Sequence, residues 1–458
     1  MRKLLLILLF WAAAAPAAGL PKPIPPVKFT DTRLDNGLRA IVSEDHQAPI
    51  YAIFISYGVG SKDERPGRTG FAHLFEHMMF KGSANVGPGE HFYLIFTNGG
   101  TMNGGTSTDT TVYYEVLPKN QLDLGLFLES DRMRSLAVTK ENLENQRATV
   151  KEERRQSRDN QAYGGSSERL MELAYDTFAY QHPVIGSMED LDAATLEDVK
   201  DFFRTYYAPN NAVLSLVGDL DPVQTLAKVK KYFGDIPRQP PPKPVDFSEK
   251  PQTAERRDRI EDKLARLTLV SIVYKIPQGG SPDIDALSVM NTALAGGESS
   301  RLYQKLVKEK EVAVSVGGGA GERIGPGLYQ LSIMVRAGKQ AEDAEKLVYE
   351  EIARLQAEGV TEKEMLRART SARRSAVSAH TGVLNLAGSL ADDATAFNDP
   401  NRLNTIEQRM TAVTAAQVRE MARKYLRPEN RTVIVTVPAA AAPAGAPKPA
   451  GAKPGTNY

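Results

Sequence analysis

The feature of this sequence that most limits its possible folds is a pattern that occurs twice. Segments 195–211 and 414–430 carry Thr, Val, Tyr, Pro and Asn at matching positions, 219 residues apart. In each copy a threonine that can cap a helix precedes an amphipathic stretch, a proline follows, and a β-branched run comes next, at 213–217 and 433–437. Because each copy closes one half of the chain, the pattern predicts a duplicated domain that ends in a helix, a turn and a strand.

The two halves also begin alike. Strands are predicted at 38–42 and 50–58 ahead of a helix at 68–81, and in the second half a strand at 267–274 precedes a helix at 284–294. The first half continues with predicted strands at 101–103 and 111–116 and predicted helices at 88–97, 120–136, 139–158 and 165–178. Strands mixed with runs of helices are typical of α+β domains. We therefore expect an α+β fold of two homologous domains, each a mainly antiparallel sheet covered by helices on one face.

The length of 458 residues is too great for one ordinary domain. A proline-rich stretch near the middle indicates a stiff linker, and the Ala/Pro/Gly-rich C-terminus is typical of a disordered segment. We expect a signal peptide at 1–18, an N-terminal domain at 28–236, a linker at 237–250, a C-terminal domain at 251–437 and a disordered tail at 438–458.

The N-terminus has the three parts of a secretory signal peptide. Arg2 and Lys3 form a basic start, an apolar run follows at 4–15, and small residues come next. A membrane anchor is the alternative, but the apolar run is shorter than the ~20 residues that a spanning helix needs. We therefore expect a periplasmic or secreted protein with no membrane span after the signal peptide is cleaved.

The charges of the chain nearly cancel. There are 57 basic and 56 acidic residues, which gives a net charge of +1. This balance offers no electrostatic reason to expect nucleic acid or an anionic membrane as a partner. The chain has no cysteine, so a bound metal ion would be held by histidine, aspartate, glutamate or water. Only six histidines are present, which makes their positions informative.

Two of these histidines lie four residues apart in the segment His73-Leu-Phe-Glu76-His77. Residues at this spacing share one face of a helix, so both imidazoles can point at one metal ion. Glu76 lies on the same flank, displaced enough to reach a metal-bound water as a general base. The surrounding residues are apolar, so the helix is expected to be buried, and charged groups in it need a functional reason. The pattern predicts a catalytic zinc site.

Structural zinc would need a closed set of four ligands, and no third histidine or cysteine is nearby. The remaining histidines are expected to have ordinary structural roles: His46, His91, His182 and His380.

The order His-x-x-Glu-His reverses the more familiar zinc-helix motif and is the inverzincin signature. Together with segments 70–82, 103–113 and 144–155, it resembles the pitrilysin/insulinase family of zinc metallopeptidases, most closely small bacterial members similar to the subunits of the mitochondrial processing peptidase. The resemblance covers residues 28–437. It implies one zinc ion and the hydrolysis of peptide bonds in peptides or unfolded polypeptides.

The resemblance also assigns roles to single residues. It implies a third zinc ligand, a glutamate, on a helix about 75 residues downstream. Physical reasoning alone does not choose among Glu144, Glu152 and Glu153 in this charged segment, and the family spacing places the ligand at Glu153. Gln146 stands where the family usually has a second glutamate. It further implies an edge strand that holds the substrate as an added strand. The glycine-rich segment 99–105 fits that strand, with Asn103 as a substrate-binding residue.

The second half lacks the groups that would complete such an enzyme. It has no histidine before His380, so it cannot repeat the metal site. In related peptidases this half supplies an arginine and a tyrosine that hold the substrate, and the matching positions here are Val307 and Val314. Arg301 and Tyr303 lie nearby but out of register. We therefore expect a heterodimer with a homologous subunit that has no zinc and supplies the arginine and tyrosine; a homodimer is the alternative.

A different class of function is a non-catalytic zinc-binding scaffold or peptide-binding subunit. Non-catalytic relatives tend to lose the zinc ligands, whereas His73, His77 and Glu153 are all present. The sequence therefore favours an exported zinc metalloendopeptidase.

Overall fold

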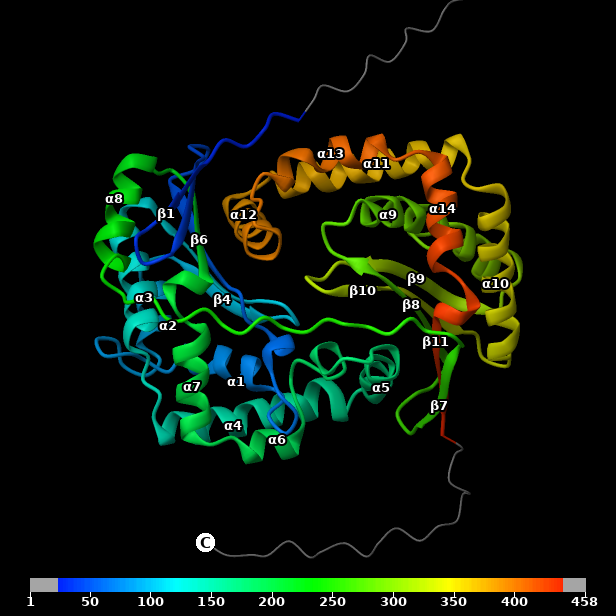
Figure 1. The fold of residues 1–458 in the computed structure, drawn as a ribbon, viewed down its shortest axis with the longest axis horizontal. Coiled ribbons are helices and arrows are strands. Elements are labelled where there is room, and N and C mark those ends of the chain that lie inside the picture. The colour runs from blue at the N-terminus through cyan, green and yellow to red at the C-terminus, as the bar shows by residue number, and fades with distance from the viewer. Residues whose placement is uncertain (1–23, 440–458) are drawn as a thin grey trace, which may run out of the picture.

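The computed structural model describes residues 24–439, which form two sheets with helices packed on them (Figure 1). The predicted signal peptide and all but two residues of the predicted tail lie outside the described residues. Of those two, Pro438 is the last residue of a strand. Within residues 24–439, no helix combines the length and the apolar character needed to cross a membrane.

The first sheet has six strands. Their spatial order is β1 (Thr30–Arg33), β2 (Arg39–Glu44), β6 (Ala212–Gly218), β3 (Ile50–Tyr57), β5 (Thr111–Pro118) and β4 (Thr101–Thr106). The strands β2 and β6 are parallel, and the other neighbours are antiparallel. This order leaves β4 as an edge strand.

The second sheet repeats this arrangement with five strands. Their order is β7 (Arg256–Asp262), β11 (Arg431–Pro438), β8 (Leu269–Gln278), β10 (Pro326–Val335) and β9 (Ala313–Gly321). Again one pair, β7 with β11, is parallel. Leu216 lies opposite Ile53 in the first sheet, and Val435 lies opposite Val270 in the second. Because Leu216 and Val435 are 219 residues apart, matching positions of the repeat lie in corresponding strands of the two sheets, and the predicted α+β fold is confirmed.

Helices surround both sheets. The first half contains α1 (Phe71–Met78), α2 (Glu90–Thr97), α3 (Leu122–Ser135), α4 (Lys140–Arg154), α5 (Gly164–Ala174), α6 (Met188–Ala193), α7 (Leu196–Tyr206) and α8 (Pro222–Phe233). The second half contains α9 (Pro282–Leu294), α10 (Ala341–Glu358), α11 (Glu362–Ala379), α12 (Val383–Phe397), α13 (Arg402–Ala412) and α14 (Ala415–Tyr425). Short 3-10 turns are η1 (Ser61–Asp63), η2 (Lys119–Gln121), η4 (Phe178–Tyr180), η5 (Pro209–Asn211) and η7 (Pro428–Asn430), and π-helical turns are η3 (Arg155–Asp159) and η6 (Tyr303–Glu309).

The repeated pattern has the same local structure in both copies. A threonine caps α7 and another caps α14. In both caps the threonine side chain accepts the N–H of the third helical residue, and the side chain of that residue accepts the N–H of the threonine. After each helix, an asparagine side chain ties the turn back to the helix end. Asn211 Nδ2 donates to Tyr206 O at 2.8 Å, and Asn430 Nδ2 donates to Tyr425 O at 2.8 Å. The shared residues therefore mark a shared cap and turn.

Each sheet packs one face on helices of its own half and the other face on a helix of the opposite half. The main cores lie between each sheet and its own helices. On the far face of the first sheet lies α12, where Gly388 approaches Phe54 so closely that a Cβ would lie 3.1 Å from the ring. On the far face of the second sheet lies α5, where Leu170 packs with Val273 and Ile434. The two halves are therefore joined by exchanged helices.

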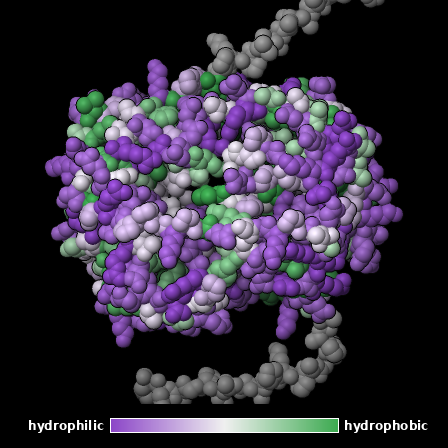
Figure 2. Space-filling model, in the orientation of Figure 1, coloured by the Kyte–Doolittle hydropathy of each residue, from purple (hydrophilic) through white to green (hydrophobic). Residues whose placement is uncertain are grey.

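The expected linker, 237–250, contains no helix or strand. Figure 1 shows this segment crossing between the halves. Its end is held in place by Glu249, which accepts backbone N–H bonds from Asp176 and Thr177 and pairs with Lys275. On the face seen in Figure 2, apolar residues gather near the centre, between the two halves, and most of the rest is hydrophilic.

Candidate metal centre

Three predicted ligand residues meet at one point in the first half. His73 and His77 lie one turn apart on α1, with ring centroids 4.8 Å apart. Glu153 approaches from α4, with Oε1 3.6 Å from His73 Nε2 and Oε2 3.3 Å from His77 Nε2. The ligand atoms of all three residues lie within 4.8 Å of one another. Glu153 is 43% exposed and the two histidines are 12% and 20% exposed, so the group opens to solvent on the glutamate side.

The position of α1 follows from its apolar residues and from the glycine that precedes it. Phe75 is buried and packs against Tyr207, with ring centroids 4.3 Å apart. Gly70 has φ +82°, and a Cβ there would lie 2.6 Å from Ile185 O. Only glycine fits this left-handed and crowded position. As a result, the first turn of α1 has no side-chain cap of its own.

A buried glutamate from outside the helix supplies the missing cap. Glu64 Oε2 accepts the N–H of Gly70 at 2.9 Å, and its Oε1 accepts the N–H of Ala72 at 2.8 Å. Unpaired N–H groups at a helix start make this end attractive to a carboxylate. Glu64 therefore fixes the end of α1 next to His73.

His182 holds Glu64 in turn. Its Nδ1 lies 2.9 Å from Phe178 O, and its Nε2 lies 2.9 Å from Ser61 O and 3.0 Å from Glu64 Oε2. Both ring nitrogens face acceptors, so both carry protons in this arrangement. Burial by itself would lower the pKa of His182, but Glu64 and the two carbonyls outweigh burial and raise it. The raised pKa of His182 favours its protonated form, while burial raises the pKa of Glu64 as well, against the opposing effect of His182 and of the N–H groups of Gly70 and Ala72.

The end of α4 is also held. Arg154, next to Glu153, donates to both carboxylate oxygens of Glu168 on α5 at 3.1 Å and to Gly186 O at 2.5 Å. The helix then widens into the π-helical turn η3, a feature that often accompanies functional sites. These bonds keep Glu153 facing α1.

Glu76 points toward the edge strand β4. Thr106 Oγ1 donates to Glu76 Oε2 at 2.6 Å. Burial raises the pKa of Glu76, and the charge of Glu153 adds to this, whereas Thr106 and His77 oppose it. The side chain lies beside the ligand group without belonging to it.

The donor set suits a zinc ion. Burial, with a smaller contribution from His77, lowers the pKa of His73 to about 4, so this imidazole is neutral, as a metal ligand must be. Its buried Nδ1 has no hydrogen-bond partner among residues 24–439, while its Nε2 faces Glu153. Two imidazoles and one carboxylate are typical zinc ligands, and three protein ligands leave a position open for water or substrate.

Other predicted residues lie outside this group. Asn103 is exposed on β4, and its Oδ1 accepts the N–H of Gly104 at 2.9 Å. Alternation along the strand turns its side chain away from the face that carries Thr106. Gln146 is buried on α4 and donates to Asn145 Oδ1 at 2.5 Å.

A second group of possible ligands lies in the core. His91 Nε2 is 2.6 Å from Glu115 Oε1, and Glu129 lies close to both. However, Arg132 donates to both oxygens of Glu129 and supplies the positive charge there. Burial raises the pKa of Glu115 and of Glu129 to about 7. This cluster is a buried ionic network that contains its own cation.

Sequence reasoning missed Thr106, Glu64 and His182. One signal was present for Glu64: a glycine at the start of a buried helix offers no side-chain cap, so a carboxylate from elsewhere is needed. For His182 and Thr106 no local signal exists, because their partners lie far away along the chain.

Comparison with known proteins agrees with this geometry. The family model described as insulinase, peptidase family M16, matches residues 39–187, and the model described as the peptidase M16 inactive domain matches residues 193–372. The chain belongs to peptidase family M16. The match to the inactive-domain model begins just before α7 of the first half and runs into α11 of the second, so it includes none of His73, His77 and Glu153.

Several relatives of this M16 chain carry the name zinc protease. Zinc protease PqqE of Helicobacter pylori is 32% identical over 289 residues, which cover 62% of this chain and 65% of that protein, just under two thirds. An uncharacterized zinc protease of Streptomyces coelicolor is 26% identical over 408 residues, 86% of each chain.

Solved structures extend the likeness to the whole fold. A protease from Helicobacter pylori has a TM-score of 0.87 and 26% identity, and the match covers 90% of this M16 chain and 100% of that one. The periplasmic protease PqqL from Escherichia coli has a TM-score of 0.74 and 20% identity, and shares the fold. The match covers 95% of this chain and 52% of PqqL, so PqqL is about twice as long.

Proposed function

We propose that this M16 chain is an exported zinc metalloendopeptidase that hydrolyses peptide bonds in peptides or unfolded polypeptides. The observation that carries the proposal is the convergence of His73, His77 and Glu153, with Glu76 beside them. The names of the relatives as zinc proteases support the metal and the reaction class. The relative described as a periplasmic protease supports export.

His73, His77 and Glu153 would hold one zinc ion. When bound, zinc supplies a Lewis acid that polarises a peptide carbonyl and makes water acidic near neutral pH. Glu76 accepts a proton from the attacking water and delivers it to the leaving nitrogen. The hydroxyl of Thr106 donates to one oxygen of Glu76 and leaves the other free for this proton transfer.

The substrate backbone would pair with the free edge of β4. An edge strand presents unpaired N–H and C=O groups that an extended peptide can bind. Because Thr106 lies on this strand and bonds to Glu76, a peptide on this edge would lie beside the metal centre. Asn103 would contact the substrate from the exposed side of β4.

A homologous partner without zinc would complete the enzyme. Val307 and Val314 stand where related peptidases have the arginine and tyrosine that hold the substrate. Arg301 cannot substitute, because it is buried and donates to both oxygens of Glu364. PqqL, about twice as long, supports the idea that two such units work together.

The decisive test is Glu76→Gln. The amide keeps the size of the side chain and can still accept the Thr106 hydrogen bond, but it cannot take a proton. We expect bound zinc to stay at one ion per chain and kcat to fall by roughly 10²- to 10⁴-fold. Metal analysis and a peptide-cleavage assay measure the two quantities. Unchanged turnover would refute the base, and zinc binding without any cleavage by the wild type would favour a scaffold or peptide-binding subunit.

A further inference from the structure

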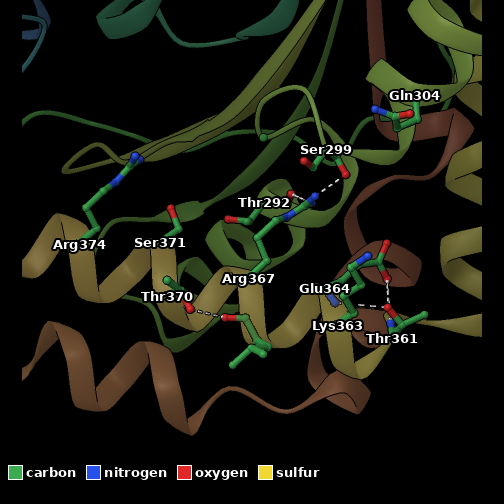
Figure 3. A pocket seen from close by; sticks show the side chains of 12 residues that line it. Thr292, Ser299, Gln304, Thr361, Lys363, Glu364, Arg367, Thr370, Ser371 and Arg374 are labelled. Carbon is green, nitrogen blue, oxygen red and sulfur yellow. Dashed lines mark hydrogen bonds between the residues drawn. The ribbon is translucent and has the colours of Figure 1, made fainter. Parts of the chain in front are cut away.

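A groove in the second half occupies the place that corresponds to the metal centre. In the first half α1 packs against α4 and the edge strand β4; in the second half α9 packs against α11 and the edge strand β9. The groove has a volume of about 960 Å³ and lies between α9 and α11 (Figure 3). Thr292 lines it from the last turn of α9 and Gly296 from the loop that follows, and its lining contains no histidine. The position that corresponds to the metal centre therefore holds a cavity with no histidine in its lining.

Positively charged side chains of α11 line one side of the groove. Lys363, Arg367 and Arg374 are spaced four and seven residues apart, so they share one face of the helix. Figure 3 shows Arg367, Ser371 and Arg374 extending from the same side of α11. Arg367 donates to the backbone carbonyls of Thr292 and Ser299. Within residues 24–439, Lys363 and Arg374 have no carboxylate within ion-pair distance.

The one acidic residue of the lining does not balance these charges. Glu364 is already paired with Arg301, with bonds of 2.6 and 2.8 Å. The guanidinium of Arg301 outweighs burial and lowers the pKa of Glu364 to about 2. The groove therefore presents net positive charge, with hydroxyl groups and the exposed side chain of Leu366 beside it.

We propose that this groove binds a peptide through its carboxylates, each held by Lys363 or by Arg374, which lie eleven residues apart along α11. Guanidinium and ammonium groups are the natural partners of carboxylates, and Arg374 can bind one through two parallel bonds. A cavity of this size is far larger than an inorganic anion, and Leu366 adds apolar contact for the rest of a chain. The proposal rests on the proposed peptidase function, because it makes the groove an anchor for acidic substrates away from the metal centre.

The carboxylate could be an acidic side chain or a free C-terminus, and binding experiments separate the two. Three fluorescent peptides differ only at two positions and at the C-terminus. One has two glutamates and an amidated end, one has two glutamines and an amidated end, and one has two glutamines and a free end. Anisotropy titrations use the full chain carrying Glu76→Gln. We expect at least one carboxylate peptide to bind on the order of threefold to tenfold more tightly than the neutral one, as for two exposed ion pairs.

The second part of the experiment removes the two positive charges from the groove. The double variant K363Q/R374Q should abolish the preference for the carboxylate peptide, whereas K339Q, which removes an exposed lysine outside the groove, should retain it. Equal binding of all three peptides, or equal loss in K339Q, would overturn the proposal. Mass spectrometry of the peptides afterwards detects cleavage by the Glu76→Gln chain, which would count against the proposed base and not against the groove.

Discussion

Neighbouring glutamates at the end of α4 have different surroundings. Glu153 faces two imidazoles, with its carboxylate oxygens 3.3 and 3.6 Å from their nitrogens. Glu152 points elsewhere and pairs with Arg155 and Gln156 in the turn η3 that follows α4. A step of one residue turns a side chain by ~100° around a helix, which accounts for the difference. The pair therefore offers a matched comparison of the proposed ligand, Glu153, with a surface residue, Glu152.

Glu153→Gln should weaken zinc binding by more than roughly 100-fold, since loss of an outer partner of a ligand already costs 10- to 100-fold. Glu152→Gln removes the same charge one position away and should leave zinc affinity unchanged. Competition with a chromogenic chelator measures both affinities. Equal affinities in the two variants would remove Glu153 from the ligand set.

At this scale the sequence predicted the two histidines and Glu76, because spacing along a single helix decides which side chains share a face. Glu153 lies on another helix, and the residues alone left it level with Glu144 and Glu152; the family resemblance singled it out. The contacts of Thr106 could not be predicted, since its hydrogen bond to Glu76 depends on how a distant strand packs.

Among the elements, α1 depends on the buried pair of Glu64 and His182. The helix was predicted at 68–81, but it spans Phe71–Met78 because Gly70 is left-handed and the carboxylate of Glu64 takes the place of a cap. Likewise, the helix predicted at 139–158 ends at Arg154 and continues as the π-helical turn η3. Periodicity indicates that a helix exists, whereas contacts from other elements decide where it ends.

His182→Gln should lower the free energy of unfolding by about 3 kcal/mol below pH 6.5, because it leaves a buried carboxylate without its cation. The pKa of His182 is raised in the folded state, so its stabilising contribution is complete below the unfolded value of about 6.5 and is lost as pH rises through the folded value. The stability difference between wild type and variant should therefore shrink at alkaline pH.

Denaturant unfolding at several pH values between 6 and 9 measures this difference. The control is His46→Gln, which removes an exposed histidine that pairs with Asp219 at the surface. That variant should change stability by less than about 1 kcal/mol. A difference that stays constant with pH would show that His182 is neutral and that the helix start is held in another way.

For the whole molecule, the fold class followed from the repeat, whereas the exchange of α5 and α12 did not. Helices were expected on one face of each sheet, and each half does cover one face with its own helices. The opposite face is covered by a helix from the other half. An amphipathic pattern predicts that a helix buries one side, but it carries no information on which sheet receives that side.

The chain by itself should cleave peptides slowly, because Val307 and Val314 cannot hold a substrate by hydrogen bonds or charge. Addition of a homologous subunit that carries the arginine and tyrosine should raise kcat/KM by about 10-fold or more. The two side chains would supply polar contacts to the substrate worth at least about 1.4 kcal/mol. The same mixture made with the Glu76→Gln chain should stay inactive. Full activity of the lone wild-type chain would exclude the need for a partner.

The exchanged helices have a consequence for a chain broken at its crossing segment. A protease that cuts among the prolines near 240 would produce two fragments, but the first fragment would still carry α5 and the second would still carry α12. Each fragment would then cover an apolar sheet face of the other, so the nicked protein should run as one particle under native conditions and as two bands in denaturant. The gene could be divided at that point, and its two products should find each other and refold as one molecule.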